Sequence, residues 1–340
     1  MRQHLNIDIH AHYVPRALLD DLVGKRHAFS SVKTTADKGA IRVAFNQEEP
    51  KRPVIPAMSD AALRRHWLEE QSIDKQVVAG WVDLFGYSLT PAEGADWARF
   101  LNEHMLKGIK EVERFVPLAT VPMQSGKLAA QVLEEALNVG FHGAMIATQP
   151  RGQASGLDDP DLNPFWEAAN ARKATLFVHP TFGACDDRLK AYGLVNALGR
   201  ITDTTIAVSR LLYSGHLQRY PDVNLVIAHG GAALPMALGR LRSSYASSPD
   251  KRADPVEGFN KLYFDSVVYD KTTLQFLCDM AGASKVMMGT DQPFANSQKN
   301  PVQFIEACCG AGTADCNAIL GETAARVFNI NSGTEHKERP

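Results

Sequence analysis

The stretch LNIDIHAH at residues 5–12 is a short apolar run that leads directly into two histidines. Its apolar and β-branched residues are typical of a buried strand. Seven more runs of this kind follow, each separated from the next by a longer stretch with helical periodicity. The eight predicted strands are Leu5–His10, Lys75–Trp81, Phe115–Val121, His142–Thr148, Thr175–His179, Asn224–His229, Lys261–Val267 and Lys285–Thr290.

Helical periodicity fills the intervals between these strands. The predicted helices span 59–72, 91–113, 126–138, 161–172, 205–219, 231–246 and 270–281, and helices at 301–309 and 313–328 close the chain. Strands with few polar residues belong to a parallel sheet that is covered on both faces. Eight such strands alternating with helices predict an α/β fold, a (β/α)8 TIM barrel.

The length of 340 residues fits either two domains or one long barrel. The eight strand runs favour a single barrel over residues 1–330. Residues 24–56 interrupt the alternation because they are polar and basic, with a hairpin signal around AIRVAF. We interpret them as a small insertion after the first strand, lying over the barrel mouth, where loops that follow strands are found. Residues 331–340 are polar and predict a frayed tail.

The charge balance points to a small-molecule partner. Thirty-six Lys and Arg face 38 Asp and Glu, so no strong field favours nucleic acid or an anionic membrane. No uncharged apolar run reaches the roughly 18 residues of a membrane span, and the first ten residues have no apolar signal core. We therefore expect a cytosolic protein that binds neither nucleic acid nor a membrane.

Histidines and one aspartate stand where the predicted strands end. His10 and His12 are two residues apart on the first strand, so both side chains face the same side. His179 ends TLFVH, His229 ends NLVIAH, and Asp291 directly follows KVMMGT. The carboxyl ends of the strands of a parallel barrel share one rim, so these five residues are expected to converge in one cleft.

Three neutral imidazoles and a carboxylate suit a divalent metal. Zn²⁺ fits this ligand set best, while Mn²⁺, Fe²⁺ and Co²⁺ also accept these ligand types. The metal would lower the pKa of a bound water toward about 7, and a remaining histidine would act as general base or acid. Gly230-Gly231 lacks the remaining spacing of a nucleotide motif, so no organic cofactor is predicted.

The sequence resembles a known family at this point. IDIHAHYVP, FVHP, the block from LQRYPDVNLVIAHGG to GRL, YFDS and GTDQPF occur in the order found in the amidohydrolase superfamily, and the combination is similar to its aminocarboxymuconate-semialdehyde decarboxylase branch. RPVIPAMSD at 52–60 and FGYSLTPAEGADWA at 85–98 extend the likeness over nearly the whole chain.

The resemblance implies specific roles for individual residues. The metal ligands would be His10, His12, His179 and Asp291. His229 would be the catalytic base that activates the metal-bound water, with Asp291 also catalytic.

Further roles concern the substrate. The resemblance makes Arg52 and Arg240 candidates for gripping a carboxylate, with Arg240 reaching across from a neighbouring subunit of a homodimer. Phe182 and Phe294 follow predicted strands and would stack on a planar acid, although aromatic residues at such places are often simply core. Asp8 is expected to be a hydrogen-bond partner behind the metal site.

Two departures from the family pattern concern the substrate. The related decarboxylase has a Lys shortly before the Arg of its RPV segment, whereas Gln47, Glu48 and Glu49 stand here and would repel a second carboxylate. Thr181 also intervenes between HP and the aromatic Phe182. Both changes lie where the substrate would be recognised, and neither touches the metal ligands.

We therefore predict a metal-dependent, non-oxidative decarboxylase of a small unsaturated or aromatic carboxylic acid. The main alternative is a hydrolase or hydratase on the same fold, in which metal-bound hydroxide attacks a lactone, amide or double bond. The same ligands serve both reactions. A third interpretation, a non-catalytic metal-binding or scaffold barrel, is disfavoured by a complete ligand set with a spare histidine.

Overall fold

The computed structural model describes residues 5–49, 52–152, 155–181, 186–250 and 252–331. Its parallel strands follow one another in chain order, as expected for a barrel. They are β1 (Ile7–His12), β4 (Lys75–Ala79), β5 (Phe115–Pro117), β6 (Ala119–Thr120), β7 (Ala144–Ala147), β8 (Thr175–His179), β9 (Asn224–Ile227), β10 (Tyr263–Asp265) and β11 (Val286–Met287). The short strands β5 and β6 are two parts of the single strand predicted at 115–121.

Backbone hydrogen bonds join the two ends of this strand order. The N–H of Ile9 donates to the carbonyl of Met288 (2.9 Å), and the N–H of Asp291 donates to the carbonyl of His10 (2.8 Å). The eighth strand region therefore lies beside the first. Together with the parallel pairing, this arrangement confirms the predicted (β/α)8 barrel.

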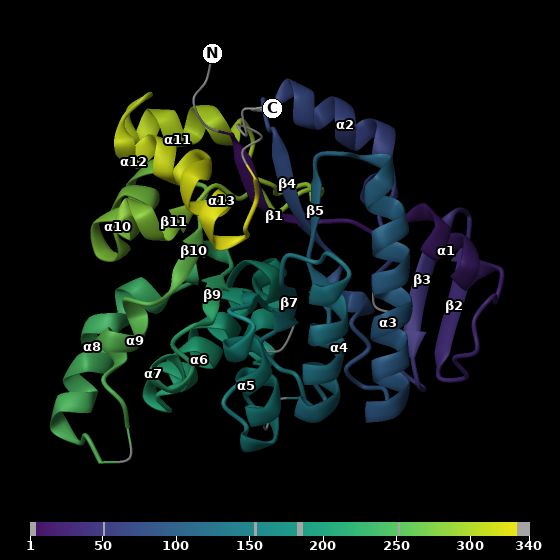
Figure 1. Cartoon of the computed structure of the whole chain (residues 1–340), viewed down its shortest axis with the longest axis horizontal. Coiled ribbons are helices and arrows are strands. Elements are labelled where there is room, and N and C mark those ends of the chain that lie inside the picture. Colours follow the sequence, from purple (N-terminus) through teal and green to yellow (C-terminus); the bar gives the residue numbers. More distant parts are fainter. Residues whose placement is uncertain (1–4, 50–51, 153–154, 182–185, 251, 332–340) are drawn as a thin grey trace, which may run out of the picture.

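Helices lie outside the strands (Figure 1). The larger ones between strands are α2 (Ala61–Glu70), α3 (Pro91–Gly108), α4 (Gly126–Asn138), α5 (Asn163–Ala171), α6 (Arg200–Tyr213), α8 (Leu234–Ser247) and α10 (Lys271–Ala281). Shorter helices are α7 (His216–Arg219) and α9 (Pro255–Phe259), and α11 (Pro301–Cys309), α12 (Ala314–Asn317) and α13 (Thr323–Val327) close the chain. Side chains of Asp60, Thr90, Ser125 and Asp270 cap four of these helices.

Two differences from the predicted helices have local causes. The helix predicted at 205–219 is divided at Gly215, whose φ of 74° lies in the left-handed region that glycine adopts without strain. The helix α1 (Arg16–Val23) was not predicted; it begins directly after Pro15 and buries Leu18, Leu19 and Leu22.

The alternation of side chains along the strands places the functional residues. On β8, Leu176 and Val178 belong to the same apolar cluster as Leu211 of helix α6. Phe177 points to the opposite side, where its ring centroid lies 5.0 Å from that of His10. His179 has the same parity as Phe177 and therefore faces the barrel interior.

The segment between the first strand and helix α2 contains an antiparallel hairpin, β2 (Val32–Asp37) and β3 (Ala40–Phe45). The hairpin lies next to α1 and α3 at one side of the barrel (Figure 1). Phe29 and Phe45 pack against Trp97 of α3, at 5.2 and 5.6 Å between ring centroids. The residues that follow β3 continue toward the carboxyl ends of the strands. Most of the tail predicted at 331–340 lies outside the described residues.

No helix within the described part of the chain is long and apolar enough to cross a membrane.

Candidate metal centre

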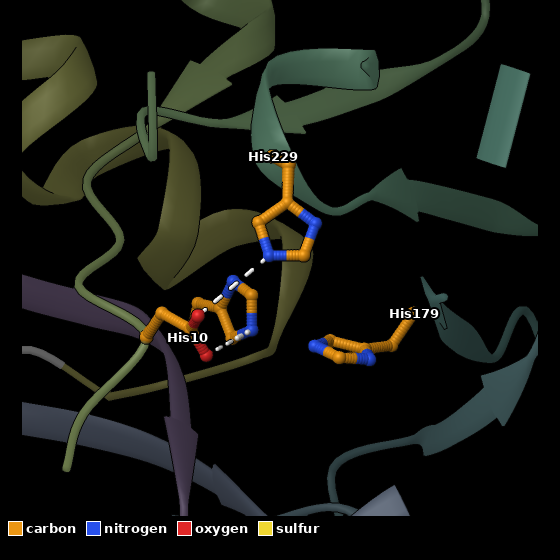
Figure 2. Close-up of side chains that lie close together, drawn as sticks. His10, His179 and His229 are labelled. Atoms are coloured by element: carbon orange, nitrogen blue, oxygen red, sulfur yellow. Dashed lines mark ion pairs between the residues drawn. The ribbon is translucent and has the colours of Figure 1, made fainter. Parts of the chain in front are cut away.

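Histidine and aspartate side chains from four separate strand ends meet inside the barrel mouth. His10 and His12 come from β1, His179 ends β8, His229 follows β9, and Asp291 follows β11. Donor atoms of His10, His179, His229 and Asp291 all lie within 4.8 Å of one another. Figure 2 shows the rings of His10, His179 and His229 directed toward a common space. The convergence expected from the strand ends is therefore present.

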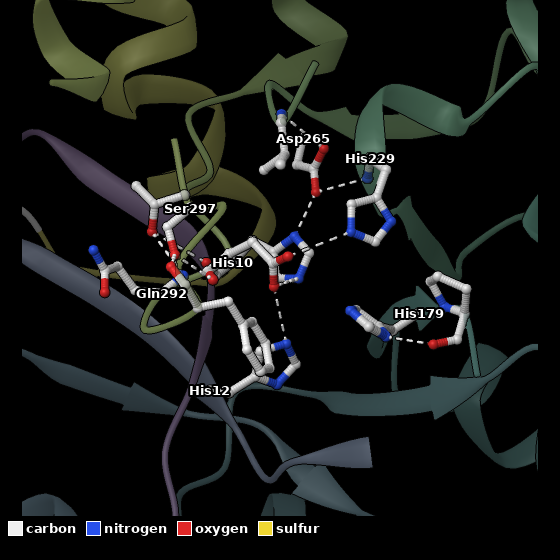
Figure 3. Close-up of polar contacts among 12 residues, drawn as sticks. His10, His12, His179, His229, Asp265, Gln292 and Ser297 are labelled. Carbon is white, nitrogen blue, oxygen red and sulfur yellow. Dashed lines mark hydrogen bonds and ion pairs between the residues drawn. The ribbon is translucent and has the colours of Figure 1, made fainter. Parts of the chain in front are cut away.

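His12 lies at the edge of this four-residue group. Its Nε2 atom is 3.3 Å from Oδ1 of Asp291, and its ring centroid is 5.0 Å from that of His179. His229 approaches the same carboxylate from the other side, with 3.7 Å between its Nε2 and Oδ2. Both histidines thus approach the carboxylate of Asp291, and Figure 3 shows their rings on either side of that of His10. The assignment of His12 as ligand and His229 as base stays a prediction.

Several atoms that face this space have no hydrogen-bond partner among the described residues. Among the described residues, Nε2 of His10, His12 and His179 and Oδ1 of Asp291 are buried and have no hydrogen-bond partner. A buried polar atom left unpaired costs about 1–3 kcal/mol. A divalent cation bound among them would satisfy all four atoms at once, so these residues fit a metal ion.

In each of these three rings, Nδ1 faces away from the cluster and is held by a hydrogen-bond acceptor of the protein. Nδ1 of His10 is 2.6 Å from Oδ2 of Asp265, Nδ1 of His179 is 2.9 Å from the carbonyl of Pro180, and Nδ1 of His12 is 3.3 Å from the carbonyl of Gly80. These acceptors assign the proton to Nδ1 in all three rings. The Nε2 lone pairs are thereby directed into the cluster, as metal ligation requires.

The charges of the cluster also favour a cation. Burial, together with the neighbouring His12 and His10, lowers the pKa of His179 well below its ordinary value, so this ring is neutral. Burial alone would raise the pKa of Asp291, but the facing histidines hold it well below its ordinary value. A neutral imidazole and an ionised carboxylate are the protonation states that bind metals.

Asp265 is a site residue that the sequence reasoning missed. Its carboxylate accepts the backbone N–H groups of His229 (2.9 Å) and Gly230 (2.8 Å) in addition to the ring of His10. His229 and Gly230 both have positive φ and form a tight turn. The hydrogen bonds from their N–H groups to the carboxylate of Asp265 stabilise this turn. Asp265 ends β10 in the structure, but the strand was predicted to run on to Val267, so the strand-end rule did not select it.

A buried polar network lies behind the first strand. Asp8 accepts hydrogen bonds from the backbone N–H of His10 (3.0 Å) and from the side chains of Gln76 (2.7 Å) and Thr290 (2.6 Å). Arg64 of α2 donates to Gln76 (2.9 Å) and to the carbonyl of His12 (3.0 Å). Asp8 is therefore the partner of the site that was predicted, although it contacts the main chain of His10 and not its imidazole.

A cavity of about 730 Å³ lies at the carboxyl ends of β4, β7 and β8. Its wall includes Arg52 and Glu49 from the segment after the hairpin, Trp81 and Asp83 after β4, and Thr181 after β8. Thr181 is two residues from His179 in the chain, so part of the cavity wall comes from the end of the strand that carries one residue of the cluster. The cavity has the size and position expected of a small-molecule site.

The residues predicted to bind the substrate lie in different parts of the structure. Arg52 forms a two-point ion pair with Asp83, at 2.9 Å and 2.7 Å, and its guanidinium lies 4.8 Å from the ring centroid of Trp81. The ring of Phe294 is 5.3 Å from that of His12, so it borders the cluster. Arg240 is exposed on α8. Phe182 lies outside the described residues.

These features define a class of protein, a (β/α)8 barrel with a histidine-rich metal centre at the carboxyl ends of its strands. Sequence comparison narrows the class. The profile of the amidohydrolase family matches residues 7–330, and the chain belongs to this family. It is 32% identical over 279 residues to 2-amino-3-carboxymuconate-6-semialdehyde decarboxylase from Dictyostelium discoideum, covering 80% of this chain and 77% of that protein.

Solved structures share the fold. The crystal structure of 5-carboxyvanillate decarboxylase from Sphingomonas paucimobilis matches with a TM-score of 0.78 and 22% identity, covering 97% of this chain and 100% of that one. A dihydroxybenzoic acid decarboxylase from Polaromonas, crystallised with bound manganese and the inhibitor 2-nitroresorcinol, matches with a TM-score of 0.76 and 21% identity over 97% and 98% of the two chains.

Proposed function

We propose that the protein is a metal-dependent, non-oxidative decarboxylase of a small aromatic or unsaturated carboxylic acid. The observation that carries the proposal is the convergence of His10, His179, His229 and Asp291 within 4.8 Å beside a cavity. The likeness to proteins named as decarboxylases supports this reaction over the hydrolase or hydratase alternative.

A divalent cation bound in the cluster would supply positive charge that stabilises negative charge developing on the oxygens of the acid. His10, His12, His179 and Asp291 would hold it. Zn²⁺ is proposed from the mixed imidazole and carboxylate set, and Mn²⁺ accepts the same ligands. Asp265 holds the ring of His10 and the backbone of His229 in place.

His229 is suited to move the proton. Its side chain is 11% exposed, in contrast to the fully buried rings of His10 and His12, so it faces the opening of the cluster. In the proposed reaction the ring of His229 transfers a proton to the carbon that bears the carboxylate. The bond between that carbon and the carboxylate then breaks, its electron pair returns to the conjugated system, and carbon dioxide leaves.

The proposal includes a homodimer. Ile206 on α6 and Met236 on α8 are exposed apolar side chains, and the N–H of Ala233 donates to Oγ1 of Thr205, which holds these helices together. Arg240 lies one helical turn beyond Met236 on α8. A second copy that covers this surface would receive Arg240 at its own cavity. The cytosolic location stays a prediction.

Release of carbon dioxide from candidate acids tests the proposal. The purified protein, loaded with Zn²⁺ or Mn²⁺, is incubated with carboxylated muconates, hydroxybenzoates and lactones. We expect carbon dioxide from at least one acid, and no incorporation of ¹⁸O from labelled water into the organic product. Incorporation of ¹⁸O without carbon dioxide would support the hydrolase or hydratase instead. Absence of bound metal and of turnover after reconstitution would favour the scaffold interpretation.

A further inference from the structure

The cavity at the strand ends has uncharged polar side chains in its wall whose hydrogen bonds are incomplete. Trp81, Tyr87 and Gln124 all line this cavity. Among the described residues, Nε1 of Trp81, the hydroxyl oxygen of Tyr87 and Oε1 of Gln124 are buried and have no hydrogen-bond partner. A buried donor or acceptor without a partner is unfavourable, so a ligand that pairs with these atoms gains affinity.

Trp81 differs in this respect from the other two buried tryptophans. Nε1 of Trp97 donates to the carbonyl of Leu84 (2.7 Å), and Nε1 of Trp166 donates to the carbonyl of Leu157 (2.9 Å). Trp81 is only 3% exposed, yet its indole N–H has no acceptor among the described residues. This N–H is therefore a donor that the fold itself does not use.

The hydroxyl of Tyr87 is a second donor at the cavity. Burial raises the pKa of Tyr87, and the backbone of Ala147 opposes this effect only in part, so the phenol keeps its proton. Ala147 ends β7 and also lines the cavity. The ring of Tyr87 packs against that of Phe85, with 5.6 Å between the centroids. These contacts hold the phenol ring in the cavity wall.

The side-chain amide of Gln124 is oriented by the loop that carries Tyr87. Its Nε2 donates to the carbonyls of Gly86 and Leu89, both at 3.4 Å. Gly94 on α3 leaves room for this amide, because a Cβ at that position would clash with Nε2. Since the nitrogen is directed at the loop, Oε1 remains as an acceptor.

The charged residues of the cavity wall do not favour a second anion. Arg52 and Arg151, the two arginines among the described lining residues, are both paired with aspartates. Glu48 and Glu49 are exposed carboxylates on the same wall. These carboxylates would repel a further negative charge, whereas an uncharged polar group meets no such repulsion.

Two strand ends connect this cavity to the histidine cluster. Trp81 follows Gly80, whose carbonyl is 3.3 Å from Nδ1 of His12. Thr181, another residue of the cavity wall, lies two positions after His179. The same parts of the barrel therefore support the cavity wall and two predicted metal ligands.

We propose that Trp81, Tyr87 and Gln124 form a neutral subsite that binds an uncharged hydroxyl or carboxamide group of the substrate. Trp81 and Tyr87 donate to the oxygen of this group, and Oε1 of Gln124 accepts its hydrogen. This inference rests on the proposed decarboxylase function and narrows its substrate to an acid with such a group away from the reacting carboxylate. A site of this kind rejects an analogue without the polar group, because its own buried polar atoms then stay unpaired.

Binding of four related acids tests the subsite without depending on turnover. Benzoate is the reference, and 3-hydroxybenzoate and 3-carbamoylbenzoate each add an uncharged polar group. Isophthalate has the shape of 3-carbamoylbenzoate but carries a second negative charge. Calorimetry measures the affinity of each acid for the metal-loaded wild type and for the metal-loaded variants Tyr87→Phe and Trp81→Phe.

The matched controls remove the same polar groups elsewhere in the chain. Tyr213→Phe deletes a hydroxyl that donates to a main-chain carbonyl (2.8 Å), and Trp166→Phe deletes an indole N–H that does the same (2.9 Å). Neither residue is part of the described cavity wall. Any effect of these controls on stability is measured alongside by thermal unfolding.

We expect the wild type to bind at least one uncharged polar acid about three- to tenfold more tightly than benzoate, and isophthalate less tightly than that acid. Tyr87→Phe and Trp81→Phe should each remove most of this gain and change benzoate binding by less than about threefold. The two controls should keep the gain. For a polar acid that the wild type decarboxylates, Tyr87→Phe should raise KM more than it lowers kcat.

Equal affinity of the wild type for benzoate and both uncharged polar acids would overturn the subsite. A preference for isophthalate, or a full gain retained in Tyr87→Phe, would do the same. If Trp81→Phe does not fold, Tyr87→Phe decides the result, because it removes one oxygen atom and keeps the ring. Loss of the gain in Tyr87→Phe, with no carbon dioxide from any acid in wild type, would contradict the proposed function and leave the neutral subsite standing.

Discussion

Oδ2 of Asp265 lies 2.6 Å from Nδ1 of His10, and both side chains are completely buried. The same carboxylate accepts the backbone N–H of His229. One side chain at the end of β10 therefore orients a predicted metal ligand from β1 and the predicted proton-transfer residue after β9. Asp265 therefore orients the residues that are proposed to bind the metal and to transfer the proton.

Replacement of Asp265 by Asn tests this dependence. The amide keeps the shape of the side chain but loses the charge that holds the N–H of His10. We expect metal affinity to fall by about 10- to 100-fold, as found when hydrogen-bond partners of metal ligands are removed. Titration of the metal-free protein with Zn²⁺, followed by calorimetry, measures the effect. Asp270→Asn, which retains an N-cap on α10, is the control; unchanged affinity in Asp265→Asn would contradict the prediction.

A second prediction separates the roles of His12 and His229, both of which flank Asp291. His229→Gln should lower the rate of carbon dioxide release by about 10²- to 10⁴-fold while the bound metal stays near the wild-type amount. His12→Gln should instead lower the metal content. Elemental analysis of both variants after dialysis gives the answer. If His229→Gln loses the metal and His12→Gln keeps it, the two roles must be exchanged.

The strands and the cluster were predictable because both depend on local pattern. His179, His229 and Asp291 each follow an apolar run, and a parallel barrel brings such ends together wherever the helices lie. The pairing of Arg52 with Asp83 was not predictable in this way. It depends on how the segment after the hairpin packs on the loop after β4, and no periodicity encodes that contact.

The buried polar network behind β1 was likewise not predictable from local sequence pattern. Arg64 belongs to α2, and its buried side chain donates to the carbonyl of His12. Arg64 was missed because this contact joins elements that are distant in sequence.

A third prediction concerns stability at acidic pH. His216 is buried against Trp166, and its Nδ1 lies at hydrogen-bond distance (2.7 Å) from Oγ of Ser214. Burial, with a smaller contribution from Arg219, lowers its pKa from 6.5 to about 4, while Asp158 acts in the opposite direction. The folded state holds the neutral ring, so the unfolded state binds the extra proton between these values.

The stability contributed by neutral His216 is therefore complete above pH 6.5 and is lost as the pH falls toward about 4. Between pH 7.5 and pH 5 this loss is about 2 kcal/mol in the free energy of unfolding. Urea unfolding at both pH values measures the free energy of unfolding. Between pH 7.5 and pH 5 it should fall by about 2 kcal/mol less in His216→Gln than in the wild type. His66→Gln, at an exposed position on α2, should keep the wild-type pH dependence; an equal pH effect in His216→Gln and wild type would refute the assignment.

A fourth prediction concerns the proposed contribution of Arg240 to the neighbouring subunit. Arg240 is exposed on α8 and, among the described residues, has no hydrogen-bond or ion-pair partner in its own chain. Arg240→Gln should therefore fold normally but lose most of its turnover. Co-expression of Arg240→Gln with His229→Gln then distinguishes action within one chain from action across the dimer.

If Arg240 acts across the interface, each mixed dimer has one site that combines an intact His229 with the partner's intact Arg240, and one site that lacks both. Random association makes about half of the dimers mixed, so the population should recover about a quarter of wild-type activity. If Arg240 acts within its own chain, every site carries one defect and no activity returns. Purification of mixed dimers by two different affinity tags raises the expected recovery to about half, and an inactive mixed dimer would exclude the contribution across the interface.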